Sequence, residues 1–170
     1  AIFAALLSFA VSAQGINISN LKGFLYKKSI DDVKAFVEPK GWKFYKKKTE
    51  ESGLESTTWT YKYTAKTDEA VAWLTITCDG TKPVRTMYEI FDFSLTMPFS
   101  TSIYESDFQF EHIEQSETEF TKRYANAELY MWEYQNKDFE KGYQYELIRK
   151  FSKADFRNGT TKRLKDKSGT

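Results

Sequence analysis

Alternation of apolar and polar side chains predicts β-strands along most of the chain. Strands of this kind are expected at 42–48, 57–65, 70–78 and 84–95, and again at 112–123, 127–135 and 142–151. The dipeptide Asp79-Gly80 lies between two of them and is typical of a tight hairpin, because both residues tolerate a positive φ. The pattern is therefore that of a strand-rich domain.

Helical spacing occurs in two places. Ile30, Val33 and Phe36 lie on one helical face, and Ser29 with Asp32 has the spacing of a capping box that would start a helix there. A Pro and a Gly shortly after residue 37 would end it. A second short helix is expected within 98–111, and the polar lead-in 14–28 as a short strand or covering segment.

These elements indicate an α+β fold with a mostly antiparallel sheet and one or two short helices, as a single domain over 14–152. Ile30, Trp59 and Trp73 recur as Ile103, Tyr130 and Tyr143, at offsets of 73, 71 and 70 residues. Near-constant offsets favour a duplicated unit of one helix and three strands, with repeats over 29–95 and 100–151. The alternative is one α+β domain whose strands share a composition.

The ends of the chain differ from this middle. Residues 1–13 begin with ten mostly apolar residues, too few to span a membrane, and end in Val11-Ser12-Ala13, which fits a signal-peptide cleavage site. A short buried helix is the alternative. Because no Met and no basic segment precede Ala1, we expect the leader's true start to lie further upstream. Residues 153–170 are basic and polar and are expected to form a flexible tail.

Composition narrows the chemistry. The 25 basic and 24 acidic residues give a net charge of +1, which disfavours nucleic-acid binding through a basic field. One histidine, His112, and one cysteine, Cys78, exclude internal disulfides, zinc fingers and multi-histidine metal sites. Cys78 shares a strand face with Leu74 and Ile76 and is expected as a buried thiol. Phosphate-binding and serine-hydrolase motifs are absent, so no metal, no cofactor and no catalytic residue are predicted.

Aromatic residues make up 17% of the chain, and two strands carry them in rows. The candidate binding residues are Trp59, Tyr61 and Tyr63 on one strand and Tyr130, Trp132 and Tyr134 on another. Exposed rows could stack on sugars or anchor a protein partner, whereas buried rows would form the floor of a core. The other faces of these strands, which include Met131 and Glu133, are expected to be more solvent-exposed than the aromatic rows. This expectation favours the core interpretation of the rows.

Two charged stretches flank these rows. The basic run comprises Lys40, Lys43, Lys46, Lys47 and Lys48, and the acidic stretch comprises Glu105, Asp107, Glu111, Glu114, Glu117 and Glu119 around His112. The lysines could contact phosphate-bearing glycans or lipids, or form a solvated strand edge that blocks aggregation. The carboxylates could bind calcium or hydrolyse a polysaccharide, or be solvated charge; the EF-hand pattern is absent.

The stretch from Ser29 to Lys47, SIDDVKAFVEPKGWKFYKK, with the aromatic strands that follow, resembles small exported proteins of Bacteroidota over residues 29–151. The resemblance implies a fold type and a bacterial periplasmic or secreted location, and it carries no functional residue over. We therefore expect an exported, non-catalytic module that binds a protein or a glycan, with no membrane span after leader cleavage. A polysaccharide hydrolase using the 105–119 carboxylates, and an inhibitor or immunity-type protein that adds a strand to its partner, are the alternatives.

Overall fold

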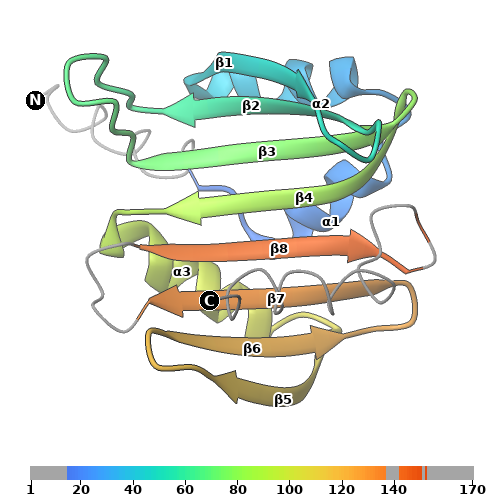
Figure 1. Cartoon of the computed structure of the whole chain (residues 1–170), viewed down its shortest axis with the longest axis vertical. Coiled ribbons are helices and arrows are strands. Elements are labelled where there is room, and N and C mark those ends of the chain that lie inside the picture. The colour runs from blue at the N-terminus through green and yellow to red at the C-terminus, as the bar shows by residue number, and fades with distance from the viewer. Residues whose placement is uncertain (1–14, 137–141, 151, 153–170) are drawn as a thin grey trace, which may run out of the picture.

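Eight strands form one antiparallel sheet in the computed structural model, which describes residues 15–136, 142–150 and 152 (Figure 1). The strands are β1 (Trp42–Thr49), β2 (Glu55–Tyr61), β3 (Ala72–Asp79), β4 (Lys82–Ile90), β5 (Gln109–Gln115), β6 (Glu119–Ala125), β7 (Leu129–Asn136) and β8 (Tyr143–Arg149). Their order across the sheet is β1-β2-β3-β4-β8-β7-β6-β5. Two four-stranded meanders thus meet at their last strands, β4 and β8.

Three α-helices lie on one face of this sheet, which we call the helix face (Figure 1). They are α1 (Ile18–Leu25), α2 (Ile30–Val37) and α3 (Phe93–Tyr104), and a 3-10 turn, η1 (Glu38–Lys40), follows α2. The predicted α+β class with a mostly antiparallel sheet is confirmed, but the described residues hold three helices rather than one or two. Every one of these helices falls short of the length and continuous apolarity that a bilayer crossing requires.

Local capping chemistry accounts for the starts of the first two helices. The Ser29 hydroxyl accepts a hydrogen bond from the Asp32 amide, and the Asp32 carboxylate accepts one from the Ser29 amide, which confirms the predicted start of α2. Asn17 and Asn20 form the same reciprocal pair at the start of α1. The lead-in 14–28 therefore contains a helix rather than a strand. Its capping box uses two Asn side chains in place of the usual Ser or Thr with Glu or Gln.

Three strand boundaries differ from the predicted ones. The strand expected at 84–95 ends at Ile90, since Asp92 caps α3 by accepting a hydrogen bond from the Ser94 amide at 2.9 Å. The strand expected at 112–123 is a hairpin of β5 and β6, which Ser116 closes by donating its amide to the Glu119 carbonyl at 2.9 Å. The first strand of the β2–β3 pair ends at Tyr61 rather than at residue 65.

Aromatic rings join the two meanders beneath α3. The ring of Phe99 lies 5.2 Å from that of Tyr88 on β4 and 4.3 Å from that of Tyr145 on β8, measured between centroids. Close ring pairs of this kind add about 0.5–1.5 kcal/mol to the area they bury. Cys78 lies in the same core with its thiol free, as predicted.

The predicted duplication gains no support from the offsets that suggested it. The offset of 71 residues relates Trp59 on β2 to Tyr130 on β7, which are the second and third strands of their meanders. The duplication stays a prediction. The leader at 1–13 and the tail at 153–170 lie outside the described residues.

Candidate functional site

The aromatic row of β2 points mostly into the core. Trp59 and Tyr61 lie on the helix face, with exposed fractions of 1% and 5%. Their burial favours the core interpretation of this row, because a ring under the helices cannot reach a ligand without opening the fold.

Tyr63 leaves that row for the opposite face of the sheet. Lys62 has a φ of +50°, a left-handed conformation that interrupts the alternation of side chains along the chain. The Tyr63 ring consequently lies 6.0 Å from Trp73 on β3 and 5.5 Å from Tyr45 on β1. Trp73 pairs with Thr60, whose side chain points away from the helices, so these three rings form a cluster on the opposite face.

The aromatic row of β7 lies on the face opposite the helices. This is contrary to the expectation that the other side of β7, with Met131 and Glu133, would be the more exposed one. Met131 is fully buried in the helix-face core, and Glu133 is 5% exposed, so the side of β7 expected to be wetter is the buried one. Tyr130 and Trp132 instead pack against Arg123, whose guanidinium carbon lies 4.7 Å and 5.7 Å from their ring centroids. Internal cation–π contacts therefore occupy much of this row.

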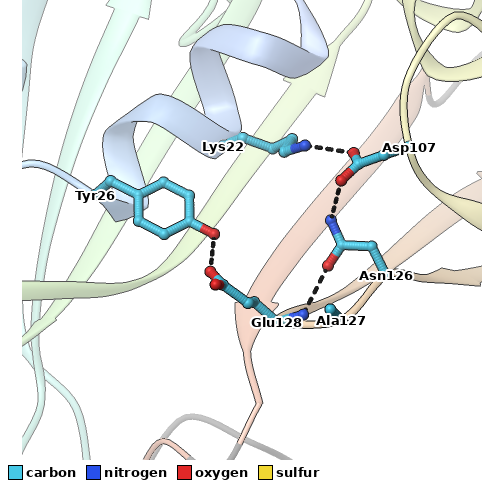
Figure 2. A pocket seen from close by; sticks show the side chains of 6 residues that line it. All are labelled: Lys22, Tyr26, Asp107, Asn126, Ala127 and Glu128. Carbon is cyan, nitrogen blue, oxygen red and sulfur yellow. Dashed lines mark hydrogen bonds and ion pairs between the residues drawn. The ribbon is translucent and has the colours of Figure 1, made fainter.

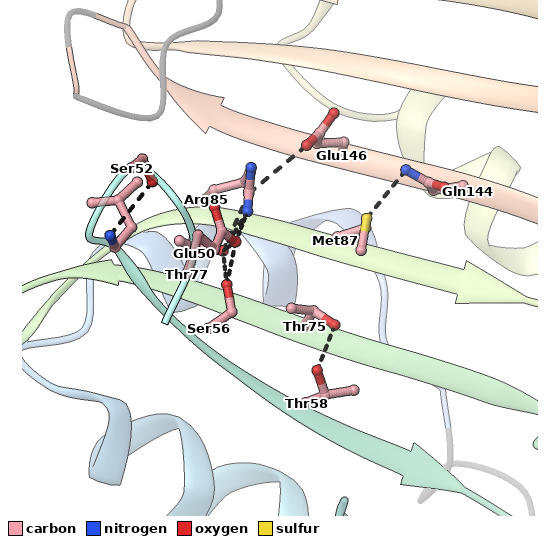
Figure 3. A network of polar contacts seen from close by, with 11 residues as sticks. Glu50, Ser52, Ser56, Thr58, Thr75, Thr77, Arg85, Met87, Gln144 and Glu146 are labelled. Atoms are coloured by element: carbon pink, nitrogen blue, oxygen red, sulfur yellow. Dashed lines mark hydrogen bonds and ion pairs between the residues drawn. The ribbon is translucent and has the colours of Figure 1, made fainter. Parts of the chain in front are cut away.

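A polar network covers part of the opposite face over β2, β3, β4 and β8 (Figure 3). Arg85 forms an ion pair with Glu50, donates to the Thr77 hydroxyl and lies with Nε 3.9 Å from Oε1 of Glu146. The Tyr134 hydroxyl donates to the Glu146 carboxylate at 3.1 Å. The loop that carries Glu50 thus folds over these strands. Their polar side chains bind one another, so fewer of them are available to a ligand.

A pocket of about 450 Å³ opens beside Trp73, and we call it the Trp73 pocket. The turn between β2 and β3 and the residue after β4 form its walls, with Lys62, Thr64, Asp68, Glu69, Ala70, Val71, Trp73 and Phe91 as lining residues. Backbone hydrogen bonds hold these walls: the Thr64 amide donates to the Glu69 carbonyl at 2.7 Å, and the Phe91 amide donates to the Val71 carbonyl at 3.0 Å. The pocket is therefore built on hydrogen-bonded backbone rather than on side chains alone.

Asp68 contributes an exposed carboxylate to the lining of this pocket. The hydroxyl of Tyr63 donates to its Oδ1 at 2.7 Å, and the hydroxyl of Tyr45 donates to the same oxygen at 3.3 Å. The hydrogen bond to Asp68 is the main reason that the pKa of Tyr63 rises to about 12, so this phenol remains a donor at neutral pH. Asp68 has a φ of +54°, a conformation in which Asp is better tolerated than most residues. Both phenols use Oδ1, and among the described residues Oδ2 of Asp68 accepts no hydrogen bond, so it remains available to a donor in the pocket.

A second pocket of about 330 Å³ lies between α1 and the β6–β7 turn (Figure 2). Its polar groups bind one another: Lys22 pairs with Asp107, the Asn126 amide donates to Asp107 at 3.0 Å, and Tyr26 donates to Glu128. Lys22 lowers the pKa of Asp107, which is the opposite of what a general acid needs. The polar contacts of this pocket therefore connect α1 to the second meander.

The rest of the acidic stretch does not converge on either pocket. On β5, Glu111 pairs with Nε of Arg123 at 2.7 Å, and Glu114 lies 3.0 Å from Nε2 of His112. Within the described residues, no three metal-ligating side chains of His, Cys, Asp or Glu come together. Glu111 and Glu114 thus each contact a side chain of β5 or β6 rather than either pocket.

Sequence reasoning singled out Tyr63 but missed its partners in the Trp73 pocket. Trp73 shares a strand face with Thr75 and Thr77, opposite the apolar face of Leu74, Ile76 and Cys78, and 66–69 was expected as a turn. Tyr63 meets Trp73 and Asp68 only because Lys62 has a positive φ. The sequence does not predict this conformation, because residue 62 is not Gly, Asn or Asp. No family model, curated protein or solved structure matches this chain.

Proposed function

We propose that the protein is an exported, non-catalytic binding module and that the Trp73 pocket holds a sugar residue of a glycan. The observation that carries the proposal is Asp68, a carboxylate held by two phenols on one oxygen, in a pocket with aromatic walls. Ligand sites combine apolar walls with a few fixed polar groups, and their volumes usually lie at about 300–1,000 Å³. The Trp73 pocket has this composition and size.

Sugar chemistry matches both parts of the site. The C–H face of a pyranose ring is apolar and packs on an aromatic side chain such as Trp73 or Phe91. Its hydroxyls donate hydrogen bonds, and charged acceptors such as Oδ2 of Asp68 form the stronger ones. Lys62 on the rim adds a donor for sugar oxygens.

The first experiment is a tryptophan-fluorescence titration with neutral oligosaccharides of glucose, mannose and N-acetylglucosamine. We expect Trp73→Ala to abolish the response and Asp68→Asn to weaken binding at least tenfold, because Asn keeps the left-handed backbone and the phenol contacts but loses the charge. Trp132→Ala, a half-buried Trp on the same face, is the matched control and should bind as the parent does. Unchanged binding by Trp73→Ala would refute the Trp73 pocket as the site, and loss of binding by Trp132→Ala alone would place the site on β7 instead.

Export rests on the predicted leader and has its own test. Expression of the complete gene should yield a mature chain that begins at Gln14, measured by intact mass in periplasmic and secreted fractions. A chain that retains residues 1–13 would contradict export by this leader and would leave the Trp73 pocket unaffected.

A further inference from the structure

The sheet ends in two edge strands of opposite charge. β1 pairs only with β2 and β5 pairs only with β6 among the described strands, so each has one row of backbone groups facing outward. The side chains of β1 include four exposed lysines and no acid: Lys43, Lys46, Lys47 and Lys48. Those of β5 include the exposed Glu111 and Glu114 and no lysine or arginine.

These charges occupy the same face of the sheet at its two ends. Lys46 and Lys48 pair with Thr58 and Ser56 across β1 and β2, which places them on the face opposite the helices. Glu114 pairs with Thr121, and Thr121 pairs with Tyr134 of β7, so Glu114 also lies on the face away from the helices. The lysines and the carboxylates would therefore meet on one side if the two edges came together.

Exposed apolar side chains lie on the other side of both edges. Phe44 on β1 pairs with the core residue Trp59, and Phe110 on β5 pairs with the core residue Tyr124, so both lie on the helix face. Phe44 is 57% exposed, while Phe110 and Ile113 are each 55% exposed. Contact between the edges would cover rings that the helices leave in solvent.

Strand direction permits this contact between two copies in the same orientation. All neighbouring strands are antiparallel and there are eight of them, so β1 and β5 run in opposite directions. A second copy placed beside the first in the same orientation would set its β1 antiparallel to β5, with both sets of helices on one side. Contact of β1 with β1, or of β5 with β5, would set like charges opposite each other, which is destabilising.

We propose that copies of this chain associate edge to edge, with β5 of one copy pairing with β1 of the next. This contact uses different surfaces on its two sides, so it leaves a free edge at each end and can extend the sheet. Each edge strand carries a bulge, between Phe44 and Lys46 and between Phe110 and His112, which confines regular pairing to about half of each strand. The association is accordingly weak and depends on ionic strength.

Sedimentation velocity of the full chain over a range of concentrations tests this proposal. We expect the average sedimentation coefficient of the parent to rise with concentration at low salt and to fall back to the monomer value at ~1 M salt, where the screening length is about 3 Å. The double variant Lys46→Glu/Lys48→Glu should remain monomeric over the same range. So should Glu114→Lys/Glu117→Lys, which changes Glu114 on β5 and the exposed Glu117 in the turn that follows it. All four side chains are exposed, and circular dichroism with thermal unfolding verifies that both variants are folded.

Mixing the two variants is the decisive measurement. On the face opposite the helices, the first variant carries two carboxylates on β1, and the second carries lysines in place of Glu114 on β5 and Glu117 in the turn after it. These reversed charges are complementary, so an equimolar mixture should recover the parent's association. Lys28→Glu/Lys82→Glu has the same charge change as the β1 variant at exposed positions outside β1 and should associate as the parent does. A parent that stays monomeric at low salt, charge variants that associate as the parent does, or a mixture that stays monomeric would each overturn the proposal.

Discussion

Gly142 provides the sharpest test of the joint between the two meanders. It precedes β8 with a φ of +73°, and a Cβ placed on it would lie 2.3 Å from the Ile90 carbonyl oxygen and 2.9 Å from Cδ1 of Phe91. Left-handed backbone costs a residue with a Cβ about 1–2 kcal/mol. The contact with Ile90 involves backbone, which cannot rotate away as a side chain can, and overpacking of this kind costs about 1–3 kcal/mol. Gly142→Ala should therefore lower the free energy of unfolding by about 2–5 kcal/mol.

Two other glycines separate the strain from the clash. Gly53 has a φ of +80° with nothing within 4 Å of an added Cβ, so Gly53→Ala should cost only the backbone strain of about 1–2 kcal/mol. Gly23 lies inside α1 with open space around it, and Gly23→Ala should stabilise the protein by about 0.5–1 kcal/mol through helix propensity.

Urea unfolding of the three variants, followed by circular dichroism, measures these differences as shifts of the midpoint at constant slope. The thermal midpoint should move in the same order, by about 2–4 °C per kcal/mol for a chain of this length. If Gly142→Ala and Gly53→Ala prove equally costly, β8 does not approach Ile90 as closely as the structure has it, and the reasoning fails.

Three further results are expected. Iodide quenching of fluorescence should be unchanged by Trp59→Phe, which removes an indole that is 1% exposed, and reduced by Trp73→Phe; a loss of quenching in the first variant alone would contradict the assigned faces of β2 and β3. Burial raises the pKa of Cys78 to about 11, so Ellman's reagent at pH 8 should label this thiol in urea but not in the native protein, and rapid native labelling would refute its burial. Arg85→Met removes the guanidinium beside Glu146, which is 3% exposed, and should lower the free energy of unfolding in urea by about 3–5 kcal/mol. Adding Glu146→Gln should recover part of that loss. A double-mutant cycle without coupling would argue against the ion pair.

Elements with a local signal could be predicted from the sequence. Ser29 and Asp32 specify the start of α2 through bonds within one turn, and Asp79-Gly80 specifies the β3–β4 hairpin, where Gly80 has a φ of +60°. Leu74 and Ile76 alternate with polar residues strongly enough to place Cys78 in the core. Each of these features depends on residues a few positions apart, so the chain carries its own evidence for them.

Other features depend on partners far away in the chain. The acidic residues of β5 and of the turn after it obscured the β5–β6 hairpin, which Ser116 closes. The alternation along β7 has a period of two and is the same whichever side is inward, so it separates Tyr130 from Met131 without saying which of them is buried. Met131 is buried because it belongs to a core with Phe24 of α1 and Phe99 of α3, which lie far from β7 in the chain.

The sequence by itself determined the class of fold, the alternation of the strands, the buried thiol and the absence of familiar catalytic motifs. Only the tertiary structure decided that the two aromatic rows lie mainly on opposite faces, that Asp68 meets Tyr45 and Tyr63 beside Trp73, and that a basic and an acidic strand form the two ends of the sheet. Periodicity records which side chains share a face, whereas the strand order and one left-handed residue, Lys62, determine what those faces contact.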